Sequence, residues 1–363
     1  MGVGEPWARY LRALGREPLP SALVDLDALE ANVDRLLAPV VASGKRLRLA
    51  TKSVRCPALL ERIAARAGEP VIGLMTYTAG ETAYYAGEGA AALGAASAIA
   101  RDLLLAYPTV HPADAALLAE ANRHAHAKVV VDELAQLAPL AAAARQAGTS
   151  IPVVIELDLG WRPLGRALHL GVRRSPLRSA GEVLALARAI AAEPSLRFAG
   201  LMGYEAQLAG LPDTAPTRAW QNPIKRALKR GSRPAVARAR AEAIRALGAA
   251  GLAPELVNGG GTGSVAWSSK DETLSEITVG SGFLAGHLFD HYAELAHAPL
   301  SPALHFALQA VRRPAPRLIT CHGGGFIASG ATGEDRQPLP VGPPGCRLLA
   351  AEGAGEVQTP LAL

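Results

Sequence analysis

Cysteine is scarce in this chain of 363 residues, and the few that occur are not spaced as disulfide or metal-binding pairs. Cys56, Cys321 and Cys346 are an odd number, and no C-x-x-C motif is present. A disulfide framework and a zinc ribbon are therefore not expected. The sequence favours a reducing, cytoplasmic setting.

Aromatic residues and excess charge are also scarce. Phe, Trp and Tyr make up 4% of the chain, and 37 basic residues stand against 32 acidic ones. The densest basic stretch, residues 218–245, contains Trp220 as its only aromatic residue, which is too little for stacking on bases. Nucleic acid is thus not an expected partner. The stretch is interpreted as a solvated helix face or loop, with a ligand or partner surface as the alternative.

Long hydrophobic runs are absent, although half of the residues are apolar. No run approaches the ~20 residues that cross a bilayer. The start of the chain, MGVGEPWARYLRALG, lacks the hydrophobic segment of a signal peptide. We therefore expect a globular protein without a membrane partner.

What the chain does contain is an alternation of short aliphatic runs and alanine-rich helical stretches, which is typical of parallel β-α-β units. Asp27, with Glu30 three residues later, is predicted to cap the first helix of the series. Eight strands over roughly 250 residues form a TIM barrel, so the sequence predicts an α/β fold with a (β/α)8 barrel. The eight candidate strands are residues 46–50, 71–75, 103–107, 128–131, 153–157, 198–202, 254–258 and 276–280.

Two stretches interrupt the alternation, and the last part of the chain differs from it. Residues 86–100 are dominated by alanine and glycine, and residues 211–234 are rich in proline and arginine; both are predicted to be long loops. After about residue 300, short runs separated by proline and glycine predict a small C-terminal β domain, with no closing strand visible at its end. The expected divisions are an N-terminal segment that joins the β domain (1–21), the barrel (22–295) and the β domain (296–363).

One lysine occupies a strand end on the expected catalytic face. Lys52 follows the first candidate strand, and the active sites of TIM barrels lie at the carboxyl ends of the strands. Partial burial and nearby cations such as Arg48 or Arg55 would lower its pKa and allow it to form a Schiff base. The alternative is a surface lysine at the start of a loop. The chain has only six lysines, which favours the functional interpretation.

A glycine-rich motif, NGGGTGS at residues 258–264, directly follows the seventh candidate strand. Its backbone N–H groups can converge on an anion, with hydroxyl donors from Thr262 and Ser264. Gly280 and Ser281 follow the eighth candidate strand, and the loops after strands seven and eight are the usual phosphate site of this fold. We therefore expect phosphate binding here. The alternative is a flexible turn, which would have the same glycine-rich composition.

A phosphate loop and a Schiff-base lysine on one barrel face indicate one of two kinds of enzyme. One is a sugar-phosphate aldolase. The other is an enzyme whose cofactor carries both the phosphate and the aldehyde, which is pyridoxal phosphate. The lysine belongs to the first strand and the loops to the last two, and the first and last strands of a closed barrel are neighbours.

The order of several motifs resembles a known family. SALVDLDALEANVDRL begins at Ser21, a lysine follows at position 52, and then come ELDLG, HLGVR, LMGYE, GGGTGS and VGSG. This series resembles the fold type III pyridoxal-phosphate enzymes, with a barrel like the alanine racemase N-terminal domain. It is most similar to the D-threonine aldolase and D-serine dehydratase branch. The resemblance covers roughly residues 20–360, and the ordered set is far more specific than any one motif.

The resemblance implies roles for particular residues. Lys52 would hold pyridoxal 5'-phosphate covalently and take part in catalysis. Arg173 would lie near the cofactor ring or the substrate carboxylate, and Tyr204 would flank the ring as a second catalytic residue. Arg162 and His169 are interpreted as ordinary loop residues. The residues implied as the phosphate site are Gly260, Gly261, Thr262, Gly263, Ser264, Gly280 and Ser281.

The metal site is where the chain departs from the family it resembles. Relatives carry near their C-terminus a His-x-Cys or His-x-Asp pair that binds a divalent metal, Mn²⁺ or Zn²⁺, and this chain ends before any such pair. Cys321 and His322 are adjacent and would point to opposite faces of a strand. His287 and His291 are interpreted as a polar helix edge rather than a metal pair. Either the chain is truncated, or its chemistry does not need the metal.

The implied function is a lyase for D-configured 3-hydroxy amino acids. It would act by retro-aldol cleavage of D-threonine-like substrates or by dehydration and deamination of D-serine-like ones. One alternative is an amino-acid racemase, which would need a tyrosine from a partner's β domain, but no tyrosine follows residue 293. The other is a protein that binds the cofactor without catalysis. A homodimer is implied, because such β domains pack near a partner's barrel mouth.

Overall fold

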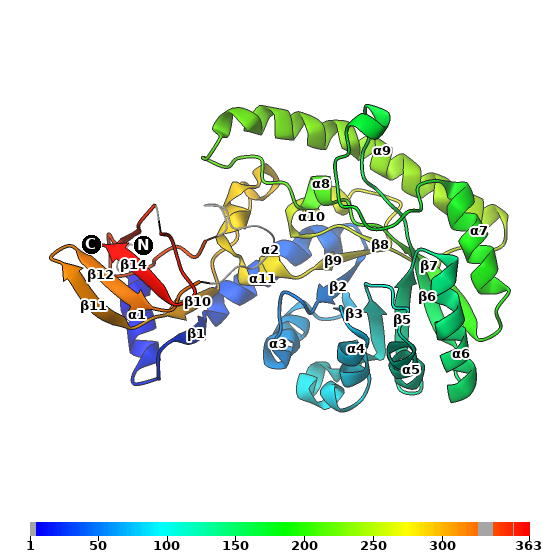
Figure 1. The fold of residues 1–363 in the computed structure, drawn as a ribbon, viewed down its shortest axis with the longest axis horizontal. Coiled ribbons are helices and arrows are strands. Elements are labelled where there is room, and N and C mark those ends of the chain that lie inside the picture. The colour runs from blue at the N-terminus through cyan, green and yellow to red at the C-terminus, as the bar shows by residue number, and fades with distance from the viewer. Residues whose placement is uncertain (1–4, 326–336, 351) are drawn as a thin grey trace.

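The computed structural model describes residues 5–325, 337–350 and 352–363. Parts of the predicted N-terminal segment (1–4) and of the predicted β domain (326–336 and 351) lie outside the described residues. The described chain forms a barrel surrounded by helices, with a smaller β structure to one side (Figure 1). The predicted fold class is confirmed.

Eight parallel strands form the barrel, in the order in which they occur in the chain, and the last pairs with the first. All eight predicted runs form strands, because aliphatic and β-branched side chains suit a strand that is covered on both faces. The strands are β2 (Arg46–Ala50), β3 (Val71–Thr76), β4 (Asp102–Leu105), β5 (His126–Val131), β6 (Ile151–Glu156), β7 (Leu196–Met202), β8 (Leu256–Gly259) and β9 (Glu276–Val279).

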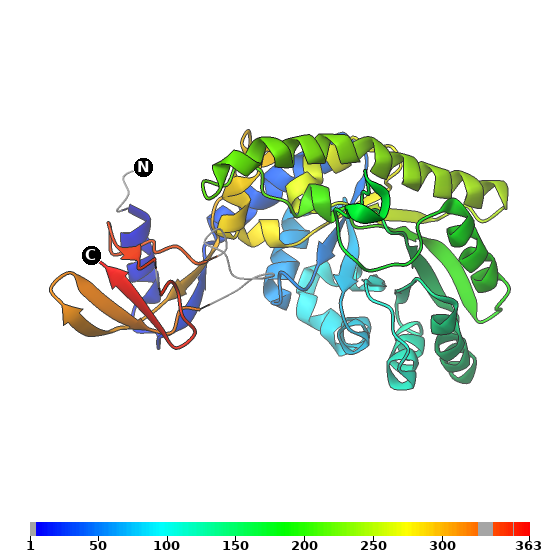
Figure 2. The same ribbon diagram turned by 45° about the horizontal axis from the view of Figure 1, so that its top comes forward.

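Helices cover the outside of the barrel (Figures 1 and 2). None of the described helices has the length and apolar character needed to cross a bilayer. The longer helices are α2 (Leu26–Ala42), α3 (Pro57–Ala67), α4 (Ala79–Ala86), α5 (Pro112–Ala121), α6 (Leu137–Ala147), α7 (Ala180–Ala191) and α9 (Asn222–Ala249). The shorter turns are η2 (Leu134–Gln136), η3 (Gly165–Ala167), α8 (Ala206–Ala209), η4 (Ala219–Gln221), η5 (Thr262–Ser264), α10 (Val265–Ser268), α11 (Ser281–Leu284), η6 (His287–His291) and η7 (Ala293–Leu295).

The barrel is held by two apolar layers and one buried polar cluster. A large core lies between strands and helices, and a smaller cluster that includes Leu104, Val130 and Val154 fills the barrel itself. Successive residues of one strand alternate between these layers. Arg48 is fully buried and pairs with Glu276 of the last strand, Nε to Oε1 at 2.7 Å. This ion pair therefore joins the first and last strands of the barrel.

The smaller β structure contains two antiparallel sheets. Strand β10 (Leu304–Ala307) pairs with β1 (Ser21–Val24), which brings the N-terminal part of the chain to the C-terminal part. Helix α1 (Glu5–Leu14) lies beside them (Figures 1 and 2), and its Tyr10 ring is 4.6 Å from the ring of His305. The second sheet has the order β11-β12-β14-β13. Its strands are β11 (Ala310–Ala315), β12 (Leu318–His322), β13 (Arg347–Leu348) and β14 (Gln358–Ala362).

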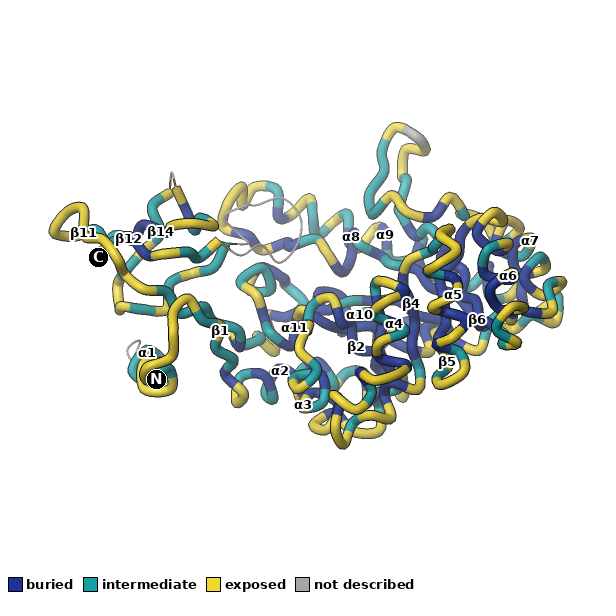
Figure 3. Tube along the Cα trace, turned by 60° about the horizontal axis from the view of Figure 1, so that its bottom comes forward, coloured by how far each residue is buried: buried dark blue, intermediate teal, exposed yellow. Residues whose placement is uncertain are grey.

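The last residues of the chain correct one expectation. No closing strand was expected at the end of the sequence, yet β14 is a strand and pairs with both β12 and β13. Its side chains alternate between polar and apolar only briefly, and Pro360 interrupts the pattern. Strand β11 is exposed along its whole length (Figure 3). The domain boundaries at residues 21 and 295 remain predictions.

Two predicted loops are largely helical. After α4, the alanine-rich stretch forms the 3-10 helix η1 (Glu88–Arg101), with a kink at Gly94. The carboxylate of Glu61 on α3 accepts the N–H of Ala95 at 3.0 Å and holds η1 against the barrel wall. Of residues 211–234, only the first part is irregular, because α9 begins at Asn222 and continues past Pro234. Alanine and arginine favour helix strongly enough to outweigh these interruptions.

The cap of the first barrel helix is Asp25, and the prediction of Asp27 is wrong. Asp25 Oδ1 accepts the N–H of Ala28 at 3.2 Å, and its Oδ2 accepts the hydroxyl of Tyr10 at 2.9 Å. Arg9 also pairs with Asp25. Asp27 lies inside the first turn, with its side chain 90% exposed. Asp25 therefore both caps α2 and ties α1 to the barrel.

Candidate active site

The barrel mouth, which is the end of the barrel where its strands terminate, carries the predicted lysine. Lys52 follows β2, and the buried Thr51 anchors this turn by donating its hydroxyl to the carbonyl of Met75 at 3.0 Å. The Lys52 ammonium lies 4.7 Å from the centre of the Tyr77 ring. Its side chain is open to the mouth, but the surrounding protein desolvates the ammonium and so lowers the pKa of Lys52, and the charge of Arg174 lowers it further. A lysine with a lowered pKa is more often a neutral nucleophile.

The cation that acts on Lys52 is not one of those expected. Arg48 points into the barrel, where Glu276 and Asp102 neutralise it. Arg55 donates from Nε to the backbone carbonyl of Lys52 at 3.0 Å and so braces the turn. The expectation that Arg48 or Arg55 lowers the pKa of Lys52 is therefore wrong, since Arg174 has this role.

Three tyrosines line the mouth, each within two residues of the end of a strand. Tyr77 follows β3, Tyr107 follows two residues after β4, and Tyr204 follows β7. The rings of Tyr77 and Tyr107 lie 6.2 Å apart. Burial raises the pKa of Tyr204 and of Tyr77 above the usual range. These phenols therefore remain protonated near neutral pH and present rings and hydroxyl donors to the mouth.

Arg174 connects several parts of this wall. Its guanidinium lies 5.2 Å from the ring centre of Tyr204 and 5.6 Å from that of Tyr107, which is within cation–π range. Its Nη1 lies 3.6 Å from Oε1 of Glu156. Arg173, which the sequence placed near the ring, is exposed, as is Arg174. The structure thus brings Arg174 against Tyr204, with its charge acting on Lys52, and the role of Arg173 stays a prediction.

Glu156 is a buried carboxyl group at the end of β6. It is 4% exposed, and burial raises its pKa to about 7; Arg174 opposes this shift and the nearby Asp132 adds to it. A group with this pKa exchanges a proton readily near neutral pH. Its position beside Arg174 places a proton carrier and a fixed cation together at the mouth.

The glycine motif forms a tight loop after β8. Gly260 has φ +78°, a left-handed conformation that favours glycine. A Cβ on Gly261 would lie 3.0 Å from Cβ of Ala209 and 3.7 Å from Cε2 of Tyr204. A Cβ on Gly263 would lie 2.3 Å from the Tyr292 ring. A side chain at Gly263 therefore does not fit, and one at Gly261 fits only if Ala209 shifts.

The loops after β8 and β9 meet, as the sequence predicts. Thr262 Oγ1 accepts the N–H of Gly282 at 3.0 Å, and Gly280 packs against Ala50 and Ser53 beside the lysine turn. Ser281 is exposed at the start of α11. Ser264 is buried, and its hydroxyl shares a 3.0 Å hydrogen bond with Ser268. Ser281 is thus freer than Ser264 to reach a bound anion.

The remaining candidate side chains lie in local structure. Arg162 pairs with Asp158 at 2.7 Å, and His169 Nε2 lies 3.1 Å from the carbonyl of Val172. His287 pairs with Asp290 at 2.8 Å. These contacts agree with the interpretation of Arg162 and His169 as loop residues.

The described residues contain no cluster of three or more metal-binding side chains. In β12, Cys321 is buried and His322 is exposed, so they face opposite sides as expected. His291 is buried, with its ring 4.8 Å from that of His287. The donor set needed to hold a divalent metal is thus not assembled by the part of the chain that the structure describes.

The donors for pyridoxal phosphate are assembled at the mouth. An amine of lowered pKa (Lys52), aromatic rings and a glycine-rich loop match the aldehyde, the ring and the phosphate of that molecule. The sequence did not reveal Tyr77, Tyr107 or Glu156, although each stands at the end of a predicted strand. That position is the signal that could have found them.

Comparisons with known proteins agree with this arrangement. A 3-hydroxy-D-aspartate aldolase of Paracoccus denitrificans (strain Pd 1222) is 29% identical over 266 residues, which are 72% of this chain and 59% of that protein. A D-threonine aldolase of Arthrobacter sp. is 28% identical over 340 residues, 93% of this chain and 79% of that protein. The chain thus spans about three fifths of the length of the former relative.

Solved structures show the same fold. A D-threonine aldolase from Filomicrobium marinum has a TM-score of 0.75 at 24% identity, over 95% of this chain and 82% of that chain. A D-threo-3-hydroxyaspartate dehydratase from Delftia sp. HT23 has a TM-score of 0.72 at 21% identity, over 96% and 84%. The sequence model described as alanine racemase, N-terminal domain, matches residues 24–283. Because this match covers more than half of the chain, the protein belongs to the alanine racemase N-terminal domain family.

Proposed function

We propose that the protein is a pyridoxal-phosphate-dependent lyase acting on D-configured 3-hydroxy amino acids. The observation that carries this proposal is that one barrel mouth holds Lys52, whose pKa is lowered, and the glycine-rich loop at residues 260–264. Similarity to aldolases and a dehydratase of 3-hydroxy-D-amino acids supports the substrate class.

Each residue of the mouth has a task in this proposal. Neutral Lys52 would hold the cofactor through its aldehyde. The loop from Gly260 to Ser264, with Gly280 and Ser281, would bind the phosphate through backbone N–H groups other than that of Gly260, which donates to Glu205. Tyr204 flanks the ring, and Arg174 holds the substrate carboxylate or a ring oxygen. Pyridoxal phosphate, when bound, accepts the electron pair released as a bond at the substrate Cα breaks.

Glu156 is the proton carrier in this proposal. Its buried carboxyl, with a pKa raised to about 7, can take a proton from the substrate side of the mouth or return one. In retro-aldol cleavage, a base removes the proton of the 3-hydroxyl group and the Cα–Cβ bond breaks. In dehydration, the Cα–H bond breaks first and the hydroxyl leaves as water. Both reactions remain within the proposal.

The metal of the family is not assigned to residues of this chain. The described side chains do not form a fitting donor set, so no step is derived through a metal.

The cellular compartment and the oligomeric state of the protein are also proposed. We propose a cytoplasmic homodimer, with residues 22–295 as the cofactor-binding barrel and the β structure as its companion. All three cysteines are free thiols, which supports a reducing compartment. The fully exposed strand β11 supports a role in contact with another subunit. Analytical ultracentrifugation measures the assembly directly.

The experiment is a product assay on the purified full chain supplied with pyridoxal phosphate. D-threonine, D-serine and 3-hydroxy-D-aspartate are compared with their L-isomers, with and without Mn²⁺ or Zn²⁺. Cleavage releases glycine and an aldehyde, whereas dehydration releases ammonia and a 2-oxo acid. We expect one of these product sets from a D-isomer. Racemisation alone, or failure to bind the cofactor, would overturn the proposal.

A further inference from the structure

A fully buried acid lies directly behind the glycine loop. Glu205 follows Tyr204 in the chain and is 0% exposed. Its Oε1 accepts the N–H of Gly260 at 3.1 Å. Gly260 is the loop residue in the left-handed conformation. The carboxylate of Glu205 therefore holds the backbone at the point where the loop departs from strand β8.

Two further buried charges support Glu205. Arg240 of α9 lies with Nη2 3.4 Å from Oε1 of Glu205, and its Nη1 donates to Oδ2 of Asp271 at 2.6 Å. Asp271 also accepts the N–H of Thr273 at 3.0 Å, which fixes the turn before β9. We call Glu205, Arg240 and Asp271 the buried triad. The triad thus links α9, the end of β7 and the chain between β8 and β9.

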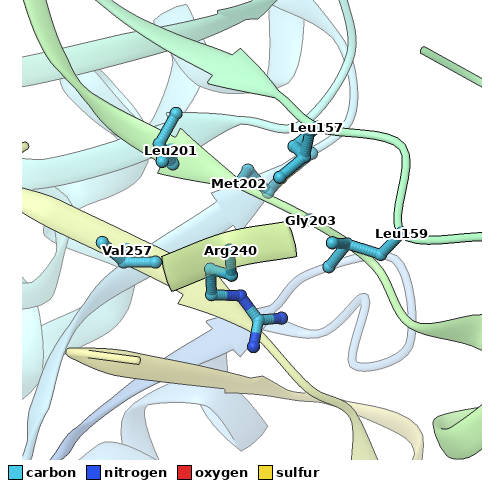
Figure 4. Close-up of a pocket in the computed structure, with 7 residues that line it drawn as sticks. All are labelled: Leu157, Leu159, Leu201, Met202, Gly203, Arg240 and Val257. Atoms are coloured by element: carbon cyan, nitrogen blue, oxygen red, sulfur yellow. The ribbon is translucent and has the colours of Figure 1, made fainter. Parts of the chain in front are cut away.

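The surroundings of Arg240 leave no room for water. Figure 4 shows Arg240 beside aliphatic side chains of the barrel wall, among them Leu157, Met202 and Val257. The narrow void between them has no room for a water molecule. In such a place, charges interact more strongly than at the surface, and a hydrogen bond to a carboxylate is stronger than one to a neutral acceptor.

Arg240 also restrains the backbone that enters the loop. A Cβ on Gly259 would lie 2.9 Å from Nη2 of Arg240, so the guanidinium packs directly against this residue. The loop cannot shift outward unless Arg240 moves, and Asp271 holds Arg240 in place. Arg240 thus holds Gly259 by packing, and Glu205 holds Gly260 by a hydrogen bond. Both residues belong to the buried triad.

The triad is coupled to the mouth through the adjacent tyrosine. Tyr204 and Glu205 are consecutive, and Gly261 lies against the Tyr204 ring. The negative charge of Glu205 contributes to the raised pKa of Tyr204. The consecutive residues Tyr204 and Glu205 therefore place the group that flanks the ring and hold the loop that begins at Gly260.

We propose that Glu205 is a positioning residue that holds the phosphate-binding loop in its binding conformation, with Arg240 and Asp271 keeping its carboxylate in place. This inference rests on the proposed function, since the ligand of the loop is the phosphate of pyridoxal phosphate. Glu205 touches neither substrate nor cofactor in this proposal. It acts through the backbone of Gly260.

The test compares binding of pyridoxal phosphate and of pyridoxal, which lacks the phosphate, to the full chain. Glu205→Ala removes the acceptor for the Gly260 N–H group. Glu205→Gln keeps an oxygen acceptor but not the charge that faces Arg240, and Asp271→Asn weakens the support of Arg240. Leu247→Ala is the control, because Leu247 is a fully buried residue two turns further along α9, away from the loop. Melting temperature is recorded for every variant.

We expect Glu205→Ala to weaken pyridoxal phosphate binding at least tenfold and pyridoxal binding less than twofold. Glu205→Gln and Asp271→Asn should show smaller losses of the same kind, and the ³¹P resonance of the bound cofactor should shift. Leu247→Ala should lower the melting temperature and leave both affinities unchanged. If Glu205→Ala does not fold, the affinities of Glu205→Gln and Asp271→Asn for pyridoxal phosphate and pyridoxal test the inference.

Two kinds of result would overturn the inference, and they separate its failure from the failure of the proposed function. Equal loss of pyridoxal phosphate and pyridoxal binding, or unchanged binding in all three variants, would show that the triad only stabilises the fold. Absence of measurable pyridoxal phosphate binding in the unmodified protein would instead overturn the proposed function and the inference with it.

Discussion

The substitution Gly263→Ala tests the packing of the phosphate-binding loop most directly. The added Cβ would lie 2.3 Å from Cε1 of Tyr292 and 2.4 Å from the carbonyl oxygen of Ala209. Tyr292 is 2% exposed, so its ring has little space to move, and the second contact is with backbone. Overpacking of this kind costs about 1–3 kcal/mol of folding free energy.

The matched control is Gly181→Ala. Gly181 lies in the first turn of α7, and a Cβ there meets no atom within 4 Å. Replacing a helical glycine by alanine stabilises by about 0.5–1 kcal/mol. The two variants therefore make the same chemical change with opposite expected signs.

Urea unfolding of the cofactor-free protein measures the stability difference, and absorbance titration measures cofactor binding. Gly263→Ala should unfold at lower urea than the unmodified protein. It should also bind pyridoxal phosphate at least tenfold more weakly, which corresponds to about 1.4 kcal/mol. If its urea midpoint and its affinity both match those of Gly181→Ala, the loop does not pack against Tyr292 as described.

Three further predictions concern the mouth and the helix cap. Lys52→Ala should lose the long-wave absorbance of the bound cofactor and any borohydride-fixed adduct, whereas Lys270→Ala on the surface should keep both. Burial raises the pKa of Glu156 from 4.5 to about 7, so the folded state binds this proton more tightly than the unfolded chain, and stability should fall as the pH rises from about 4.5 to 7. Glu156→Gln should remove up to about 3 kcal/mol of that fall; an unchanged profile of urea midpoint against pH would contradict this. Asp25→Ala should cost about 0.5–2 kcal/mol in urea unfolding, and Asp27→Ala close to nothing, whereas the reverse order would restore Asp27 as the cap.

The barrel was predictable because its pattern is strong and repeated. Buried parallel strands need aliphatic runs, and all eight are visible in the sequence. The 3-10 helix at 88–101 was not predictable, because alanine and glycine give no apolar periodicity. The N-terminal half of α9 was missed because Pro234 and many arginines resemble a loop, although the helix continues through them.

The candidate site was predictable where its residues follow strands and less so for the residues that support them. Lys52 and the glycine loop stand beside predicted strands, so their position at the barrel mouth follows from the sequence, and their roles stay predictions. The contacts of Arg174 with Tyr204 and Glu156 depend on the path of an irregular loop, which the sequence pattern does not determine. Glu205 and Arg240 are far apart in sequence, and only tertiary structure brings them together.

The closure of the barrel has a consequence for synthesis of the protein. Strand β2 finds its second neighbour only in β9, and Arg48 and Glu276 are 228 positions apart in the chain. A ribosome adds residues at about 5–20 per second, so roughly 10 to 50 s pass between the emergence of the two strands. During that time the outer edge of β2 is open to pairing with other chains, and Arg48 has Asp102 but not yet Glu276 as a carboxylate partner. High contact order of this kind slows folding, and the period of greatest exposure to aggregation ends when residues 276–279 arrive.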